Sequence, residues 1–210
     1  MLTFKKHSLH FNYILLASSI LLAISACTPL NQYALVEMPL LSVDLLKKNW
    51  QVTQSIKISP DRISGNTGST AKIIPEFISA WATLNNQLTV VGLTSTGQLL
   101  MRLHYSNQQF TETYSPLVKQ TVPGREILAQ LQLAHWPIQA IEETFEKTQW
   151  KIVQQRVRQG HIRKVYLKNQ LVLDIIYTSE YTPSRPNDVI IRNHPKQYKL
   201  QITTLTATDL

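Results

Sequence analysis

The alternation of hydrophobic and polar positions predicts β-strands along most of the chain. From Trp50 to Ile58, apolar residues alternate with polar ones, as in a strand with one buried face. Residues 80–84 and 88–93 repeat this period and are joined by Asn85-Asn86, which tolerates the positive φ angles of a tight hairpin. Neighbouring strands are therefore expected to pair in a meander. The remaining predicted strands are residues 98–105, 150–158, 161–167, 171–178, 189–192 and 197–206.

Between these groups of strands the period changes to that of a helix. Pro123 suits a first helical turn, and Trp136-Pro137 should divide the segment in two, because proline removes a helix hydrogen bond and disfavours the α conformation of the preceding residue. The first helix carries an apolar stripe of Ile127, Leu128, Leu131, Ala134 and His135, and the second carries Ile138, Ile141 and Phe145 inward. An antiparallel sheet covered by a short helical pair is an α+β architecture.

The N-terminus has the layout of a secretory signal. Lys5 and Lys6 precede an apolar run from Ile14 to Ala26, which is shorter than the roughly 20 residues of a membrane-spanning helix. The run ends in Ile24-Ser25-Ala26-Cys27, which resembles a bacterial lipobox. The resemblance implies that the thiol of Cys27, the one cysteine of the chain, receives a diacylglycerol before cleavage. The alternative is a free or buried cysteine behind an ordinary cleaved signal.

These boundaries predict three parts: a signal peptide at residues 1–26, a lipidated N-terminus and tether at residues 27–42, and one periplasmic domain at residues 43–210. Two or more acyl chains hold a protein firmly on a bilayer. Thr28 stands where enterobacterial lipoproteins retained in the inner membrane have aspartate, so the resemblance implies a lipid anchor in the outer membrane, facing the periplasm.

The net charge of +8 changes the expected partners. A run from Lys147 to Lys168 is basic and contains no acidic residue. An exported protein does not meet nucleic acid, so anionic lipid headgroups or an acidic partner are the candidates. The alternative is a solvated outer face of a β-hairpin. The proposed anionic-surface contacts are Arg156, Arg158, Arg163 and Lys164.

Three short motifs carry a resemblance to a known family. The motifs are Gly97-Gln98-Leu99-Leu100, His104-Tyr105, and the segment from Leu128 through Leu131-Gln132-Leu133-Ala134 to Trp136-Pro137. Together they resemble a family of uncharacterised bacterial lipoproteins with a LolA/LolB-like fold. The resemblance implies a strongly curved, unclosed antiparallel sheet whose apolar cavity receives acyl chains from a LolA-like carrier or from acylated cargo. LolB bears a protruding leucine before the glycine of an exposed loop, and Thr96 is the corresponding residue here.

The cavity interpretation requires apolar side chains on the concave sheet face and on the helices, although the same side chains also suit an ordinary core. The candidates are Leu88, Val90, Leu99, Met101, Leu103, Leu128, Leu131, Trp136, Ile141, Leu173 and Ile175. The expected function is to bind acyl chains or lipidated cargo as a monomer and to assist the localisation of lipoproteins or lipids to the outer membrane. The alternative is a non-catalytic accessory lipoprotein of an envelope complex.

An esterase-type hydrolase is the less favoured interpretation. The sequence contains no G-x-S-x-G turn, no H-E-x-x-H motif and no glycine-rich phosphate loop. His104, His135, His161 and His194 have no metal-ligand spacing. We therefore expect no enzymatic activity, no metal and no cofactor.

Overall fold

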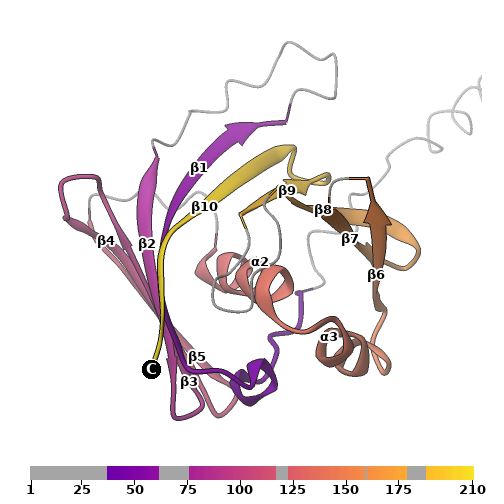
Figure 1. Ribbon diagram of the computed structural model, residues 1–210, viewed down its shortest axis with the longest axis horizontal. Helices are drawn as coiled ribbons and strands as arrows, with labels where there is room; N and C mark the ends of the chain where they lie inside the picture. Colours follow the sequence, from indigo (N-terminus) through magenta and orange to yellow (C-terminus); the bar gives the residue numbers. More distant parts are fainter. Residues whose placement is uncertain (1–36, 62–75, 117–122, 159, 179–187) are drawn as a thin grey trace, which may run out of the picture. The chain divides into compact units, whose positions relative to one another are not determined.

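The computed structural model describes residues 37–61, 76–116, 123–158, 160–178 and 188–210. Residues 38–210 form one compact unit. Within the described ranges, ten strands make a single sheet in the order β5-β4-β3-β2-β1-β10-β9-β8-β7-β6 (Figure 1). The strands are β1 (Trp50–Pro60), β2 (Phe77–Leu84), β3 (Gln87–Leu93), β4 (Leu99–Ser106), β5 (Gln109–Tyr114), β6 (Trp150–Val157), β7 (Gly160–Leu167), β8 (Gln170–Tyr177), β9 (Val189–Asn193) and β10 (Tyr198–Asp209).

The sheet consists of two antiparallel meanders joined at the first and last strands. β1 to β5 follow one another, as do β6 to β10. β1 and β10 pair from Trp50 opposite Asp209 to Pro60 opposite Tyr198, and this pairing joins the two halves. The expected meander is confirmed.

Tight hairpin turns depend on residues that accept positive φ. Asn85 and Asn86 have φ of 51° and 59° between β2 and β3, as predicted. Asn107 and Gln108 make a second such turn, with φ of 48° and 63°, and lead into β5. This strand was not predicted, because none of its residues is buried and an edge strand needs no alternating apolar face.

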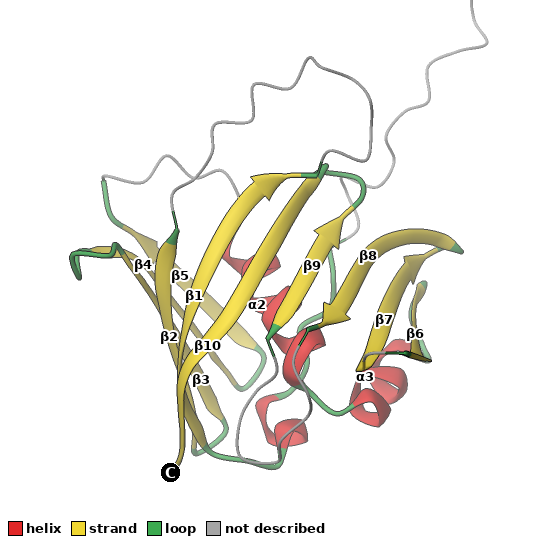
Figure 2. Cartoon of the chain, turned by 45° about the horizontal axis from the view of Figure 1, so that its top comes forward, coloured by secondary structure: helices red, strands yellow, loops and turns green. Residues whose placement is uncertain are grey.

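The sheet is strongly curved and does not close. Its register shifts in three strand pairs, between Thr53 and Gln54, between Gly92 and Leu93, and between Val165 and Tyr166. Bulges of this kind bend a strand and increase its twist. Figure 2 shows the resulting curve around the helices, and β5 and β6 stand at opposite ends of the strand order.

The helices are α2 (Gly124–His135) and α3 (Ile138–Phe145), with a short 3-10 helix, η3 (Val43–Leu46). The break at Trp136-Pro137 is confirmed, since Trp136 is extended at the end of α2 and Pro137 precedes α3. Every residue of α2 from Leu128 to Ala134 is buried, as in a helix enclosed on all sides. α2 therefore lies inside the concavity rather than only across it (Figure 1).

No helix in the described part of the chain is both long enough and apolar enough to span a bilayer.

The chain enters the core earlier than the expected tether boundary at residue 42. Leu41 is buried, and its backbone N–H donates to Gln132 Oε1 at 2.9 Å while its carbonyl accepts from Gln132 Nε2 at 2.7 Å. Residues 41 and 42 thus belong to the domain. Cys27 and the expected signal peptide lie outside the described residues.

Candidate functional site

The apolar residues expected to line a cavity lie mostly in the core around α2. Leu99 is the exception, with 41% of its surface exposed. The register of β3 and β4 shifts beside it, so that Met101 pairs with Gly92 but Leu99 pairs with Leu93, and Leu99 leaves the buried row. The buried members of the set are Leu88, Val90, Met101, Leu103, Leu128, Leu131, Trp136, Ile141, Leu173 and Ile175. Contact of any of them with a ligand stays a prediction.

An apolar pocket with a cavity volume of about 20 Å³ lies between α2 and the sheet. α2 contributes Ile127, Gln130 and Leu131, and the sheet contributes residues of β1, β2, β3 and β10. Such a volume holds about one water molecule, whereas ligand pockets span about 300–1,000 Å³. The resemblance implied an open cavity, but the protein's own helix fills the concavity.

Of the predicted site residues, the pocket uses only Val90 and Leu131. Sequence reasoning missed Ile56 on β1 and Leu200 and Ile202 on β10 as site residues. Their alternation with polar neighbours marks the buried face of each strand. Because Ile56 pairs with Ile202 and Ile58 pairs with Leu200, these residues of β1 and β10 form one wall of the pocket. No local sequence pattern predicts this strand pairing.

A polar cluster ties the N-terminal end of α2 to the β9–β10 hairpin. Glu126 Oε1 accepts from Tyr198 Oη at 2.8 Å, from Asn193 Nδ2 at 3.1 Å and from Gln130 Nε2 at 3.3 Å. Glu126 Oε2 pairs with Lys196 at the surface. Burial, followed by the neighbouring Glu126 carboxylate, raises the pKa of Tyr198, so its hydroxyl remains a donor at neutral pH. Because Gln130 also lines the pocket, the cluster adjoins the pocket.

Gly124 allows the start of α2 to approach the sheet closely. Its N–H donates to Glu112 Oε2 at 3.1 Å, which satisfies one of the free amides of the first turn. A Cβ at this position would lie 2.4 Å from Leu103 Cδ2 and 2.7 Å from Glu112 Oε2. A side chain at this position would therefore force Leu103 and Glu112 to shift.

The C-terminal end of α2 is held by Arg163 and Tyr177. Arg163 Nη1 donates to the carbonyls of Leu133 at 2.6 Å and Trp136 at 2.8 Å, and Tyr177 Oη donates to the carbonyl of Ala134 at 2.6 Å. These donors satisfy three backbone acceptors at the helix end. Burial raises the pKa of Tyr177 to about 12, an effect that Arg163 opposes.

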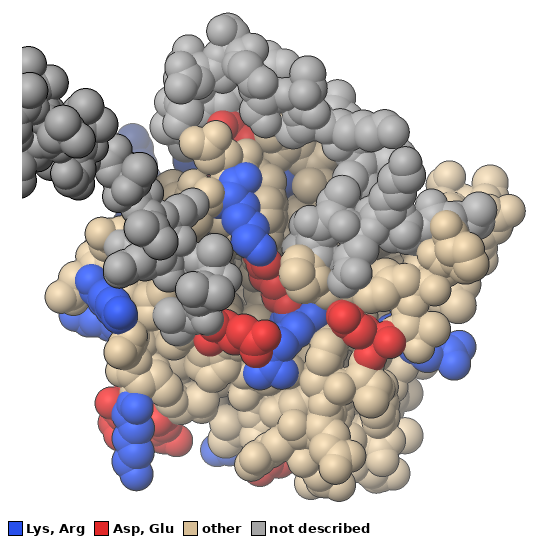
Figure 3. Space-filling view, turned by 180° about the vertical axis from the view of Figure 1, so that it is seen from behind, with Lys and Arg blue, Asp and Glu red and all other residues tan. Residues whose placement is uncertain are grey.

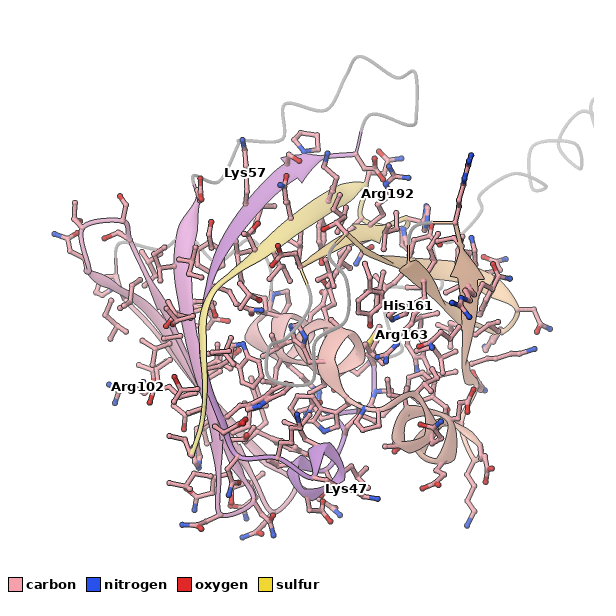
Figure 4. The ribbon with its side chains drawn as sticks, in the orientation of Figure 1. Lys47, Lys57, Arg102, His161, Arg163 and Arg192 are labelled. Carbon is pink, nitrogen blue, oxygen red and sulfur yellow. The ribbon has the colours of Figure 1, made fainter. Side chains whose placement is uncertain are left out.

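The position of Arg163 corrects the expected basic surface. Its side chain faces α2 beside His161 (Figure 4) and the residue is only 7% exposed. Burial lowers the pKa of the guanidinium from its usual value. Its Nη1 donates to the two carbonyls at the end of α2 and its Nε donates to Gln154 Oε1 at 3.0 Å. Arg163 therefore acts as a helix cap. Arg156 and Arg158 are exposed at the β6–β7 hairpin, and Lys164 Nζ lies 3.2 Å from Asp174 Oδ1.

Charges of both signs are interleaved over the face seen in Figure 3. The three residues Arg156, Arg158 and Lys164 stay proposed contacts with an anionic surface.

Trp136 and Gln132 attach α2 to the entering chain. Trp136 Nε1 donates to the carbonyl of Ser42 at 3.0 Å, while both amide atoms of Gln132 bond the backbone of Leu41. The indole of Trp136, which we expected to be rigidly held, is fully buried. The indole therefore helps to hold α2 against the segment that enters the domain.

A buried polar network crosses the core behind α2. Gln54 Oε1 accepts from Trp81 Nε1 at 2.9 Å, and Gln54 Nε2 donates to Thr204 Oγ1 at 3.1 Å. Gln54 Nε2 also lies 3.3 Å from His135 Nε2, and the His135 ring stacks on Trp81 at 5.6 Å. Burial, followed by the charge of Arg163, lowers the pKa of His135 to about 3. The neutral imidazole therefore accepts from Gln54.

The other histidines among the described residues have separate neighbours. His104 Nδ1 lies 3.2 Å from Thr89 Oγ1, and His194 Nε2 lies 2.8 Å from Asp174 Oδ2, whose other oxygen contacts Lys164. His161 stacks on Tyr177 at 3.8 Å. Across the described ranges, no three histidine, cysteine or acidic side chains gather as metal ligands.

The fold and its core define an α+β domain with a curved, unclosed antiparallel sheet around a central helix, as expected. Residues 38–206 match the family described as "Protein of unknown function (DUF3261)". The chain belongs to this family, which confirms the expected family of uncharacterised function.

No curated protein matches the chain. Among solved structures, the chain is similar to a "putative outer membrane lipoprotein-sorting protein domain" from Vibrio parahaemolyticus, with a TM-score of 0.42 and 8% identity, over 80% of this chain and 92% of that one. An overlap of this size implies nothing about the activity of this chain.

Proposed function

We propose that this protein is a lipoprotein of the bacterial outer membrane, anchored through Cys27, whose domain takes an acyl chain between α2 and the sheet. The observation that supports this function is the apolar pocket where Ile127 and Leu131 of α2 meet Ile56, Leu200 and Ile202 of the β1–β10 wall. The walls of the pocket are mainly aliphatic. They therefore suit a hydrocarbon chain and do not suit a charged substrate.

The small volume of the pocket requires an opened state. The N-terminal end of α2 is the easier end to release, because the Glu126 cluster is partly solvated and Lys196 is 48% exposed on its side chain. Exposed ion pairs stabilise by only about 0–1 kcal/mol. At the other end, Arg163 and Tyr177 bond buried carbonyls. We therefore propose that the N-terminal half of α2 moves away from the sheet while its C-terminal end acts as the hinge.

The energies permit such an opening. Exposing the side chains of Ile127, Leu131 and the fully buried Leu128 costs about 4.5–9 kcal/mol, at about 1.5–3 kcal/mol for each. Burying a chain of about 16 carbons returns roughly 10 kcal/mol, at about 0.8 kcal/mol per methylene, before ordering costs. The acyl chain then passes between the carrier, this domain and the bilayer according to their relative affinities for it, and no covalent bond is formed or broken.

The filled concavity favours one alternative, an accessory lipoprotein that binds another envelope protein and no lipid. The pocket between α2 and the sheet has a volume of only about 20 Å³, so an acyl site requires an opening of the domain, whereas an accessory role requires none.

Native mass spectrometry of residues 38–210 with palmitate separates the two functions. We expect the parent domain to retain palmitate and Ile127→Gln to lose it, because Ile127 lies at the pocket. Ile138→Gln is the matched control, since Ile138 is also a half-buried helical isoleucine but belongs to α3. A parent domain that never retains palmitate, or equal loss in both variants, would contradict acyl binding.

A further inference from the structure

The outer side of the sheet, facing away from α2, carries a row of charged side chains across four strands. Cross-strand pairs place Lys164 of β7 beside Asp174 of β8, Asp174 beside Arg192 of β9, and Arg192 beside Lys199 of β10. Residues directly opposed in antiparallel strands share a face. Ile191, next to Arg192, is fully buried on the inner side, so the row points outward. With strands about 4.8 Å apart, it spans about 14 Å.

A second outward row runs beside the first and is largely aliphatic. Ile162, Ile176 and Ile190 are opposed to one another on β7, β8 and β9, and the row continues through Gln201 to Lys57. The three isoleucines are half-buried and Lys57 is exposed. Figure 4 shows Lys57 and Arg192 on the side of the sheet away from α2.

The cations of these two rows outnumber the carboxylates of the same rows. Asp174 is the one carboxylate in the two rows, and it is bonded by Lys164 at 3.2 Å and by His194 at 2.8 Å. Within the part of the chain that the structure describes, Lys57, Arg192 and Lys199 form no ion pair. No described carboxylate therefore neutralises these charges, of which Lys57 is exposed, Lys199 is half-buried, and Arg192 is half-buried with its Nε atom inaccessible to solvent.

We propose that this outer cationic face, formed by Lys57, Arg192 and Lys199 with Ile162, Ile176 and Ile190, docks on an anionic phospholipid surface. A surface that combines aliphatic side chains with a basic border suits the boundary between lipid headgroups and acyl chains. Each basic residue near an anionic leaflet strengthens binding about fivefold. Phosphate headgroups supply the opposite charge, and the isoleucines contact the interfacial carbons.

The length of the connection to the membrane permits such docking. Residues 28–37 between Cys27 and the described domain reach at most about 33 Å at roughly 3.3 Å per residue. The domain thus stays within reach of the leaflet that holds its anchor. This reach rests on the proposed anchor at Cys27, whereas the binding experiment uses the domain without it.

Vesicle sedimentation of residues 38–210, a compact unit with its own core, tests the docking. We expect binding to phosphatidylcholine vesicles that contain phosphatidylglycerol, little binding to phosphatidylcholine alone, and weaker binding as salt is raised. Lys57→Gln with Lys199→Gln should weaken binding about 25-fold, at about fivefold per charge. The control is Arg102→Gln with Lys147→Gln, which removes the same charge from exposed residues outside the face and should leave binding close to that of the parent.

Two further variants test the geometry of contact. Ile190→Trp places an indole on the outer face, while the native tryptophans are all buried; its fluorescence should shift to the blue only with phosphatidylglycerol present. Asp174→Asn removes the carboxylate between the cations and should tighten binding about fivefold.

Three results would overturn the proposal: equal binding to both kinds of vesicle, a loss in the control pair as large as in the Lys57 and Lys199 pair, or an Ile190→Trp spectrum that does not change. Binding of poly-glutamate through Lys57 and Lys199 without vesicle binding would assign the face to an acidic protein instead. Palmitate retention is measured without vesicles, so failure of docking and failure of acyl binding are distinguishable.

Discussion

Replacing Glu126 with glutamine should lower the stability of the domain and at the same time raise its affinity for an acyl chain. Glu126 accepts three hydrogen bonds through Oε1, from Tyr198, Asn193 and Gln130, and pairs with Lys196. Glutamine is nearly isosteric but loses the charge. The weakened hydrogen bonds and the lost surface pair should together cost about 1.5 kcal/mol.

The increase in affinity follows from the proposed opening. A ligand that binds only an opened state has an apparent affinity proportional to the population of that state. If the Glu126 cluster holds the N-terminal end of α2 closed, a loss of about 1.5 kcal/mol raises the opened population and the apparent affinity about tenfold. Urea denaturation measures the stability, and titration with a fluorescent long-chain fatty acid measures the affinity.

Tyr177→Phe is the matched control at the other end of α2. It removes the 2.6 Å bond to the carbonyl of Ala134 and should cost about 1–2 kcal/mol of stability. Because this end is the proposed hinge, fatty-acid affinity should not rise. An unchanged or lower affinity in Glu126→Gln, or an equal rise in both variants, would refute the reasoning.

Two other substitutions test the packing around α2. Gly124→Ala places a Cβ 2.4 Å from Leu103 Cδ2, and the domain should lose about 1–3 kcal/mol of urea stability from overpacking; a more stable variant would show that the approach is not tight. Arg163→Met leaves the carbonyls of Leu133 and Trp136 without their donor and should cost about 3 kcal/mol in the same assay, whereas an unchanged midpoint would mean that the cap is dispensable.

His135→Gln concerns pH: the pKa of His135 falls from 6.5 to about 3 on folding, so the unfolded chain binds the extra proton and stability is lost as pH falls below about 6.5. The slope approaches 1.4 kcal/mol per pH unit. His135→Gln should reduce this slope in denaturation curves taken between neutral and mildly acidic pH, and the part that remains is expected from His161, whose pKa burial also lowers. An unaltered slope would place the titration elsewhere.

Local sequence patterns predicted well those elements whose boundaries depend on the backbone restrictions of single residues. The Trp136-Pro137 break and the Asn85-Asn86 turn follow from backbone restrictions of single residues, and both are present. β5 escaped prediction because its side chains are exposed at the sheet edge. An exposed edge strand leaves no hydrophobic period to detect.

The position of α2 could not be predicted, because it depends on contacts between distant residues. Gln132 gives no sign in the sequence of being interior, yet it is fully buried and bonds Leu41, which is 91 positions away. Arg163 belongs to a basic run that suggests a solvated surface, and its actual partners are the carbonyls of Leu133 and Trp136. Arg163 is buried because the helix in the concavity brings backbone acceptors to it. Gln132 lies on that helix and is buried because the entering chain brings the N–H and the carbonyl of Leu41 to it.

The pocket was partly predictable for a related reason. Val90 and Leu131 stand in clear apolar patterns and were among the candidates, whereas the wall of Ile56 and Ile202 exists only because β1 pairs with β10. That pairing joins opposite ends of the domain. A sequence period marks which face of each strand is buried, but it does not identify the strand that becomes its neighbour.

Photo-crosslinking of residues 38–210 with a diazirine-bearing palmitate, followed by peptide mapping, tests the proposed acyl site most directly. The account predicts label on α2 at Ile127 and Leu131 and on the facing wall at Leu200 and Ile202. Label confined to the outer isoleucines Ile162, Ile176 and Ile190, or the absence of any specific label, would contradict the claim that an acyl chain enters between α2 and the sheet.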